Sequence, residues 1–396
     1  MKLAFVLFKY FPYGGLQRDF FRIAQLCRAR GHSVDVFTLR WEGPVPEGFK
    51  VHVVSAGGWL GYLGRNLALA RAVERAKREE GFGAVVGFNK LPGLDVYFAA
   101  DPCYAARSRP WWKCLTPRHR QFMAFEKAVF APQAGVEILV ITPREIERFI
   151  RRYGTPAARF HELPPGIARD RVAPPDAAQR RAEWRAEFGV AADDLALLMV
   201  ASAFPVKGVD RAVKALAALP EPLRGRCRLF VVGDDRPGRF AALAERLGVD
   251  GRVNFCGGRD DVPRFLLGAD LFVHPARTEL AGMALLEAVV AGLPVLCSGV
   301  CGYAFHVLKA GAGRVVPEPF NQEAFNAVLC DMLVSPERSA WARNGVDYGQ
   351  REDLYSLPEK AVRVIETLAE RQAQNPACGN TPDAAKSPTR TVSFKN

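Results

Sequence analysis

Several features are missing from this 396-residue sequence, and each absence excludes a class of protein. The longest apolar runs, such as residues 195–201 and 283–290, are too short to cross a bilayer, which takes about 20 apolar residues. Residues 1–4 lead into a predicted strand and not into an export signal. The nine cysteines are odd in number and scattered through apolar runs, which argues against a disulfide framework. We therefore expect a cytosolic protein with reduced, buried thiols.

Sequence motifs for metal-dependent and hydrolytic chemistry are also absent. The chain has no Asp-x-Asp, His-Glu-x-x-His, Gly-x-Ser-x-Gly or Gly-x-x-x-x-Gly-Lys-[Ser/Thr] motif. Cys297 and Cys301 are four residues apart, but no second pair or histidine cluster accompanies them. We predict no metal, no other cofactor and no hydrolase triad.

Basic residues outnumber acidic ones, and the net charge of +12 indicates an anionic partner. A nucleic acid, a phosphorylated substrate and an anionic membrane would all fit. The total charge alone does not distinguish between them.

The first residues predict a strand, a glycine turn and a helix. Residues 3–8 form an apolar run, Gly14 and Gly15 make a turn, and residues 33–38 return as a strand. Between them, apolar residues recur at helical spacing: Leu16, Phe20, Ile23, Ala24 and Cys27. In such a βαβ unit the backbone amides of Gly14 and Gly15 face a ligand at the carboxyl edge of the sheet.

The same alternation continues along the chain, so the fold class is α/β with parallel sheets. Further strands are expected near 51–54, 84–88, 95–99, 137–141, 195–200, 228–232, 253–256, 270–274, 294–298 and 313–316. Helices in the second half are expected near 208–218, 238–247, 260–267, 283–291 and 321–334. A proline-containing stretch from Leu163 to Gln179 separates the halves and is typical of an interdomain linker. Two Rossmann-like domains facing a cleft follow from this pattern.

We place the domain boundaries accordingly. An N-terminal domain spans residues 1–165 and a C-terminal domain spans residues 166–352. Residues 353–371 form a last helix, and the polar residues 372–396 form a disordered tail.

The clearest candidate site lies around Glu279 and Glu287, which flank the predicted start of a helix at Gly282. The first N–H groups of a helix lack intrahelical acceptors and attract anions, so a diphosphate would fit at Gly282 and Met283. The two carboxylates would then hold the hydroxyl groups at the two ends of a nucleoside diphosphate sugar. Taken by spacing alone, the pair is also compatible with ordinary surface glutamates.

Three further residues lie where parallel strands end. Lys207 precedes Gly208 at a strand-to-helix junction and would neutralise a phosphate, unless it is a solvated loop lysine. Asp19 in the first helix and Asp101 after the 95–99 strand would bind acceptor hydroxyls. Each could equally be a helix-start charge or a cap.

Residues 103–132 are basic and aromatic. They contain six Lys or Arg and one Glu. The predicted membrane-binding residues are Arg109, Trp111, Trp112, Lys113, Arg118 and Arg120, because indoles sit at headgroup depth and cations meet lipid phosphates. Phe122, Phe125 and Val129 share one helical face, which ordinary packing explains equally well. Nucleic-acid binding is not favoured, because no known module pattern is present.

Four stretches resemble a known family: residues 8–19, 86–95, 163–167 and 279–287. They are similar to the lipopolysaccharide core glucosyltransferase I family, which belongs to the retaining glycosyltransferase family 4 and has the GT-B fold. The resemblance runs from Met1 to about Leu368. It implies a last helix that crosses back to the first domain.

The resemblance also implies an activity. Members of the family transfer glucose from UDP-glucose to an inner-core heptose of lipopolysaccharide with an α-1,3 linkage. They work on the cytoplasmic face of the inner membrane as peripheral proteins, and they use no metal. The partners expected from it are therefore a UDP-sugar donor, a heptosylated lipid A-core acceptor and an anionic membrane surface.

Roles for individual residues follow from the same resemblance. Glu287 would bind the ribose, Glu279 the donor sugar, and Lys207 would stabilise charge on the departing UDP. The donor set is Gly14, Gly15, Lys207, Arg211, Glu279, Ala281, Gly282, Met283 and Glu287. The catalytic set is Asp19, Asp101, Lys207 and Glu279.

One position departs from the family. Its members usually have Arg-Lys-Gly where this chain has Val206-Lys207-Gly208, so one phosphate cation is missing. Arg211, one turn further on, is the predicted substitute. The departure leaves open an alternative reading, in which the chain is a catalytically weakened sugar-binding or membrane-surface scaffold of the same fold.

Overall fold

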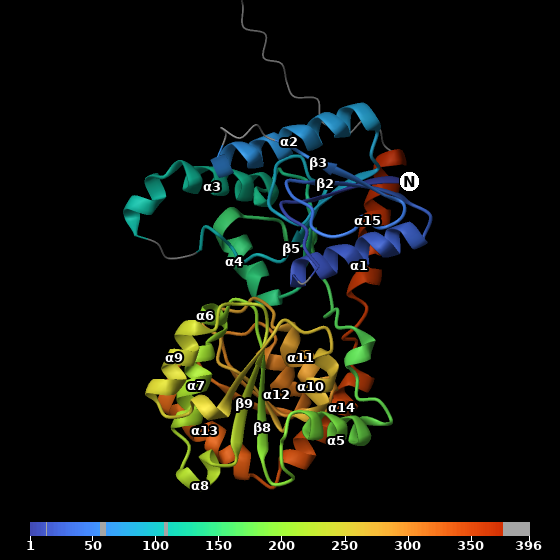
Figure 1. The fold of residues 1–396 in the computed structure, drawn as a ribbon. Helices are drawn as coiled ribbons and strands as arrows, with labels where there is room; N and C mark the ends of the chain where they lie inside the picture. Colours follow the sequence, from blue (N-terminus) through green and yellow to red (C-terminus); the bar gives the residue numbers. More distant parts are fainter. Residues whose placement is uncertain (13, 56–60, 107–109, 375–396) are drawn as a thin grey trace, which may run out of the picture.

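Two parallel sheets, each covered by helices, make up the structure (Figure 1). This computed structural model describes residues 1–12, 14–55, 61–106 and 110–374. The predicted α/β class with two Rossmann-like units is confirmed, because every strand pairing within the two sheets is parallel.

The first sheet has the strand order β3-β2-β1-β4-β5-β6-β7. Its strands are β1 Lys2–Leu7, β2 Ser33–Thr38, β3 Phe49–Val53, β4 Ala84–Gly87, β5 Val96–Ala99, β6 Glu137–Val140 and β7 Phe160–Glu162. The helical segments around it are α1 Gly15–Ala29, α2 Gly61–Glu80, η1 Trp111–Leu115, α3 Pro117–Phe130, α4 Pro143–Tyr153, η2 Ala157–Arg159 and η3 Arg169–Arg171.

The second sheet has the order β10-β9-β8-β11-β12-β13. Its strands are β8 Leu195–Val200, β9 Cys227–Val232, β10 Val253–Gly257, β11 Leu271–His274, β12 Val295–Ser298 and β13 Gly313–Val316. Its helices are α5 Ala177–Glu187, α6 Phe204–Lys207, α7 Val209–Ala217, α8 Glu221–Arg224, α9 Gly238–Arg246, η4 Asp250–Arg252, α10 Val262–Gly268, α11 Met283–Val290, α12 Ala304–Ala310, α13 Gln322–Val334, α14 Arg338–Arg351 and α15 Leu357–Gln374, the last of which leaves this domain.

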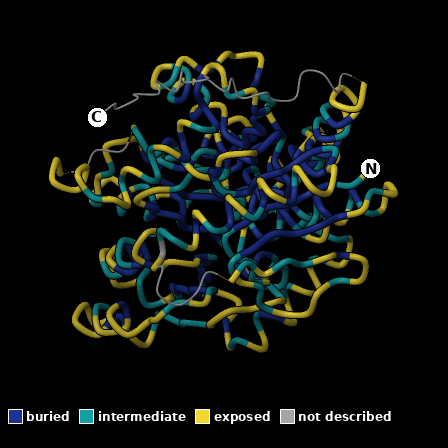
Figure 2. The backbone as a smooth tube through the Cα atoms, turned by 90° about the horizontal axis from the view of Figure 1, so that it is seen from above, coloured by how far each residue is buried: buried dark blue, intermediate teal, exposed yellow. Residues whose placement is uncertain are grey.

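The central strands are nearly continuous apolar runs because helices cover both faces of each sheet. In β1 all residues from Leu3 to Leu7 are buried, and Phe5 packs against Phe20 and Phe88. Seen from above the view of Figure 1, most of the buried backbone lies in the centre and exposed turns surround it (Figure 2). This packing fixes the positions of the carboxyl ends of the strands. The candidate residues lie in the segments that follow those ends.

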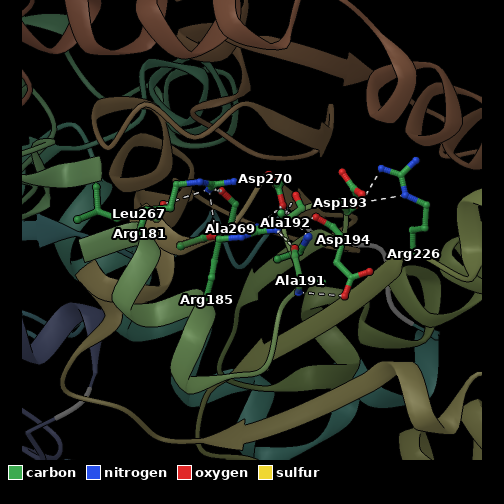
Figure 3. Close-up of polar contacts among 12 residues, drawn as sticks. Arg181, Arg185, Ala191, Ala192, Asp193, Asp194, Arg226, Leu267, Ala269 and Asp270 are labelled. Carbon is green, nitrogen blue, oxygen red and sulfur yellow. Dashed lines mark hydrogen bonds and ion pairs between the residues drawn. The ribbon is translucent and has the colours of Figure 1, made fainter. Parts of the chain in front are cut away.

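Helix α5 is anchored to the amino ends of the second sheet by charged groups (Figure 3). Asp270 accepts hydrogen bonds from Arg181 at 2.6 Å, from Arg185 at 3.0 Å and from the N–H of Ala196 at 2.7 Å. The Arg181 guanidinium also donates to the carbonyl of Ala269. These contacts lie at the opposite end of the strands from the candidate site, so their role is structural.

The chain passes between the domains twice. The N–H of Ile167 donates to the carbonyl of Leu354, which joins the two crossing segments. Beyond the second crossing, Glu366 of α15 accepts hydrogen bonds from Arg30 at 2.7 Å and pairs with His32 at 2.8 Å, and both partners belong to the first domain. The predicted return of the last helix to the first domain is confirmed.

Some elements differ from the sequence-based expectations. The predicted linker to Gln179 is too long, because α5 already begins at Ala177. Only Trp184 is buried on that helix, so the sequence carries no helical periodicity there. Helices α2, α4, α6, α8, α12 and α14 were also not predicted. Residues 372–374 belong to α15 and not to a tail, and residues 375–396 lie outside the described residues.

Within the described part of the chain, no helix combines the length and the apolar character needed to span a membrane.

Candidate functional site

The candidate residues gather between the domains, at the carboxyl ends of the two sheets. The β1–α1 turn with Gly14 and Gly15 comes from the first sheet. The second sheet contributes Lys207, the last residue of the short helix α6 that follows β8, and Glu279 in the β11–α11 connection. Open parallel sheets bind ligands at this edge.

Glu279 forms the centre of a partly buried charged cluster. Its carboxylate pairs with the ammonium of Lys207, and its Oε2 lies 3.2 Å from Nε2 of His274. Burial alone would raise the pKa of Glu279, but the hydrogen bond with His274 and the charge of Lys207 lower it to about 2. The side chain of Glu279 is only 13% exposed, so it is not an ordinary surface glutamate.

Lys207 is held in place by two unusual backbone positions. Helix α6 starts after Ala203, whose φ of 57° is the left-handed region that non-glycine residues seldom adopt. Gly208 ends the helix with φ of 78°, and a side chain there would collide with the carbonyl of Pro275. The chain at Gly208 thus packs closely against the loop that contains Pro275, and this contact brings Lys207 to Glu279.

Helix α11 begins at Met283 behind Gly282, whose φ is 97°, as the sequence predicts. The loop before it is fixed by backbone hydrogen bonds. Gly302 donates to the carbonyl of Glu279 at 3.3 Å, and Tyr303 donates to that of Ala281 at 2.7 Å. The first N–H groups of α11 therefore start from a rigid loop and have no acidic residue in the first turn.

Glu287 is the point where α11 meets the first domain. It is 5% exposed, and its carboxylate lies 3.3 Å from Nη1 of Arg18 and 3.9 Å from Nε of Arg171. Among the described side chains, buried nitrogen atoms of both arginines have no hydrogen-bond partner. Unpaired buried donors are costly, so this cluster has unused capacity for an anionic or hydroxylic ligand.

Asp19 lies close to the same cluster. It is 7% exposed, and its Oδ1 has no hydrogen-bond partner among the described residues. Burial raises its pKa to about 6; the charges of Arg18 and Arg22 oppose this shift, and that of Glu287 adds to it. The structure therefore brings Asp19 beside Glu287 on the first-domain side of the cleft.

The two glycines at the start of α1 have different surroundings. Gly14 caps the helix in an extended conformation without a side-chain hydrogen bond, and the first turn contains no acidic residue. A side-chain carbon added at Gly15 would meet no atom within 4 Å, whereas one at Gly14 would collide with Gln17. The start of α1 is therefore open on the side of Gly15 and filled on the side of Gly14.

The structure does not place Arg211 as a free cation. Its guanidinium donates to the carbonyls of Pro275 and Ala276 at 3.1 and 3.0 Å and lies 3.7 Å above the ring of Phe320. It supports the β11 loop, so the prediction that it replaces the missing arginine lacks support in this geometry. Val206 is 37% exposed.

A second arginine lies beside Val206. The N–H of Arg277 donates to the carbonyl of Val206 at 2.8 Å, and its guanidinium forms a two-point pair with Asp210 at 2.7 Å for each bond. This cation was not predicted from the sequence.

Asp101 is exposed after β5, outside the buried cluster around Asp19. The residues that follow it are fixed by Glu126, which is fully buried and accepts hydrogen bonds from the N–H groups of Tyr104 and Ala105 at 2.7 and 2.9 Å. Lys90 pairs with Glu126 at 2.5 Å. The loop beside Asp101 is thus tied to α3.

The predicted membrane-binding residues lie mostly on one exposed segment. Trp111 and Trp112 of η1 are 76% and 54% exposed, and Lys113, Arg118 and Arg120 are exposed beside them. Arg109 lies outside the described residues. Phe125 and Val129 of α3 are buried in the core, so the packing explanation for them is confirmed.

The structure also describes eight of the nine cysteines. Five are buried and two are partly buried, as expected, but Cys114 in η1 is exposed. Among the described residues, no group of three or more His, Cys, Asp or Glu side chains is arranged to hold a metal ion.

Four functional candidates were missed or underrated from the sequence: Arg18, Arg171, His274 and Arg277. Arg18 sits next to the predicted Asp19, but helical spacing did not show that it faces α11. His274 is buried at the end of β11, and its Nε2 lies 3.2 Å from Oε2 of Glu279. Contacts between distant segments carry no local sequence signal.

Comparisons with known proteins agree with this arrangement. The family described as "Glycosyltransferase Family 4" matches residues 13–171, and that described as "Glycosyl transferases group 1" matches residues 180–347. The chain is 47% identical to the lipopolysaccharide glucosyltransferase WaaG of Escherichia coli (strain K12), over 92% of this chain and 98% of WaaG. It is 26% identical to the D-inositol 3-phosphate glycosyltransferase of Xylanimonas cellulosilytica, over 92% of this chain and 93% of that protein.

Solved structures give the same result. The crystal structure of WaaG matches with a TM-score of 0.86 and covers 92% of this chain and 99% of the WaaG chain. Anabaena HepE in complex with UDP and glucose matches with a TM-score of 0.70 at 20% identity, over 93% of this chain and all of that one, which shows the fold alone. Given 47% identity to WaaG over nearly the full length of both chains, this chain is a glycosyltransferase with the GT-B fold and belongs to the lipopolysaccharide glucosyltransferase family.

Proposed function

We propose that this enzyme transfers glucose from UDP-glucose to an inner-core heptose of lipopolysaccharide, with an α-1,3 linkage and retention of configuration. The observation that carries the proposal is the pair of carboxylates on either side of the start of α11, of which Glu287 is buried and Glu279 is partly buried. Glu279 pairs with Lys207, and Glu287 pairs with Arg18 across the cleft. A nucleotide sugar needs acceptors for hydroxyl groups at both ends and donors for the phosphates between them.

The donor lies across the start of α11, with its ribose at Glu287 within the helix and its sugar at Glu279 in the loop before it. Glu287 accepts hydrogen bonds from the ribose hydroxyls, and Glu279 accepts them from the sugar. The N–H groups at Gly282 and Met283 bind the diphosphate, helped by the positive end of the helix dipole. The low pKa of Glu279 supports this role, because a carboxylate that is ionised at neutral pH is an acceptor only.

The transfer takes place on one face of the sugar. The acceptor hydroxyl attacks the anomeric carbon as its bond to the UDP oxygen breaks, and the hydroxyl proton passes to the departing phosphate oxygen. Lys207 and the amides at the starts of α11 and α1 stabilise the negative charge that develops on UDP, without a metal or another cofactor. Asp19 and Asp101 line the acceptor side.

The acceptor is a heptosylated lipid A-core, which is embedded in a membrane. The exposed Trp111 and Trp112, with Lys113, Arg118 and Arg120, dock the enzyme on an anionic surface at the cytoplasmic face of the inner membrane. The net charge of +12 supports an anionic surface as the partner.

A donor screen tests this function. Purified enzyme is mixed with heptosylated acceptor and with UDP-glucose, UDP-galactose or a UDP-amino sugar, and the product is weighed by mass spectrometry. We expect one added hexose with UDP-glucose and little product with the other donors. Equal or greater product with another donor would replace glucose in the proposal.

The exposed Val206 keeps one alternative open, a catalytically weakened scaffold of the same fold. Such a protein would bind UDP-sugar without turning it over. Measuring UDP release with and without acceptor separates the two, because only an enzyme releases more UDP when acceptor is present.

A further inference from the structure

A cavity of about 360 Å³ lies between the domains, next to the donor residues but not formed by them. Thr142, Pro143 and Arg144 at the start of α4 form its first-domain wall. The second-domain wall consists of Gly299, Cys301, Gly302, Ala304, Phe305, Leu308 and Val315. Since both domains contribute walls, the cavity has this shape only when they are in contact.

Backbone contacts tie the cavity to the donor loop. Cys301 forms a parallel β-bridge with Glu279, and the N–H of Gly302 donates to the carbonyl of Glu279 at 3.3 Å. From the other domain, the hydroxyl of Thr142 donates to the carbonyl of Leu280 at 3.1 Å. Paired strands lie about 5 Å apart, so the wall at Cys301 is roughly one strand spacing from the backbone of Glu279.

The side chains around the cavity combine a cation with exposed apolar surface. Arg144 is exposed in the first turn of α4. Phe305 and Leu308 are 47% and 60% exposed and lie three residues apart on one face of α12. The ring of Phe305 stacks on that of His306 with centroids 4.1 Å apart, which limits its movement.

These groups match a particular kind of ligand. An arginine binds phosphate or carboxylate oxygens through several donors at once. An aromatic ring presents a flat apolar face, on which the C–H face of a sugar ring can lie. A sugar with an anionic substituent uses both, whereas a plain apolar ligand would leave Arg144 without a partner.

We propose that this cavity is an acceptor subsite that binds a sugar unit carrying an anionic group. Arg144 pairs with the anion, and Phe305 covers the apolar face of the sugar ring. The bound unit lies beside the donor loop, so that a hydroxyl of the acceptor is directed toward the sugar held by Glu279. This inference rests on the proposed function and extends it by naming residues that select the acceptor.

Steady-state kinetics with Arg144→Ala and Phe305→Ala test the subsite. Arg151→Ala is the matched control on α4, since Arg151 pairs with Glu147 and does not line the cavity. Leu247→Ala is the control for removing an exposed apolar side chain. We expect the acceptor KM to rise about tenfold in each test variant, with the donor KM and the UDP release without acceptor unchanged. Both controls should match the native enzyme.

A second acceptor sharpens the assignment. With an acceptor from which the anionic group has been removed, Arg144→Ala should raise the acceptor KM less than twofold. Phe305→Ala should still raise it about tenfold. Unchanged acceptor KM in both variants would overturn the subsite, and an equal Arg144→Ala effect with both acceptors would overturn the pairing with the anion. If the native enzyme transfers sugar to no heptose acceptor, the proposed function itself fails.

Discussion

Arg18 of the first domain lies 3.3 Å from Glu287 of the second, so the carboxylate that we assign to the ribose is also a contact between the domains. Arg171 approaches the same carboxylate from the segment that joins the domains. Donor binding at Glu287 and the relative position of the domains are therefore linked through one side chain.

Glu287→Ala should weaken UDP binding at least tenfold, because the ribose loses a charged acceptor and the two arginines lose their partner. The Kd for UDP is measured by calorimetry. Glu323→Ala, an exposed glutamate in the first turn of α13, should bind UDP like the native enzyme. An unchanged Kd in Glu287→Ala would contradict the ribose assignment.

Lys207→Ala should lower kcat about 10²-fold or more, because the cation that stabilises the departing UDP is removed. The effect on the UDP Kd should be much smaller. Lys214→Ala on the neighbouring helix α7 is the control, since this lysine is exposed. A loss confined to the donor KM would assign Lys207 to ground-state binding only.

Asp19 should make stability depend on pH. Its pKa is about 6 in the folded protein and 3.8 in the unfolded chain, so the folded state binds the proton more tightly. The free energy of unfolding should therefore fall as the pH rises from about 4 to 6 and then level off. Asp19→Asn should remove this decrease and be more stable at pH 7.5 by roughly 1–3 kcal/mol.

Urea unfolding at pH 4.5 and pH 7.5 measures this difference. If the free energy of unfolding decreases equally in the native protein and in Asp19→Asn, groups other than Asp19 cause the decrease.

The triple variant Trp111→Ala, Trp112→Ala, Lys113→Ala should lose most binding to anionic vesicles in co-sedimentation. The control Arg246→Ala, Leu247→Ala, Val334→Ala removes one cation and two exposed apolar side chains from the second domain. Native binding should also weaken as salt is added. Undiminished binding of the first variant would rule out η1 as the docking segment.

Val206→Arg should raise turnover with the native donor, if the site is one phosphate cation short. The gain corresponds to a charge-assisted hydrogen bond of about 1.5–3 kcal/mol. Combining it with Arg277→Ala tests whether Arg277, which contacts the carbonyl of Val206, already supplies that charge. Turnover that stays the same or falls in Val206→Arg would show that no cation is missing.

Most of the fold was predictable because buried parallel strands are short apolar runs bounded by glycine or proline. All strands of both sheets were expected except β7, which has only three residues and no apolar pattern. Helix α5 escaped prediction because it buries only Trp184, which leaves no periodic signal. The glycine-led start of α11 was predictable because only a left-handed residue fits there.

The sequence by itself determined the α/β class, the glycine turns and the identity of Glu279 and Glu287 as candidates, since local spacing specifies strands, helix starts and motifs. Only the tertiary structure decided which charges meet. Arg18 and Glu287 are separated by 269 residues, and Lys207 and Glu279 by 72, yet each pair is in contact. Such pairs depend on how two sheets pack and how loops approach each other, and this information is not contained in any local stretch of sequence.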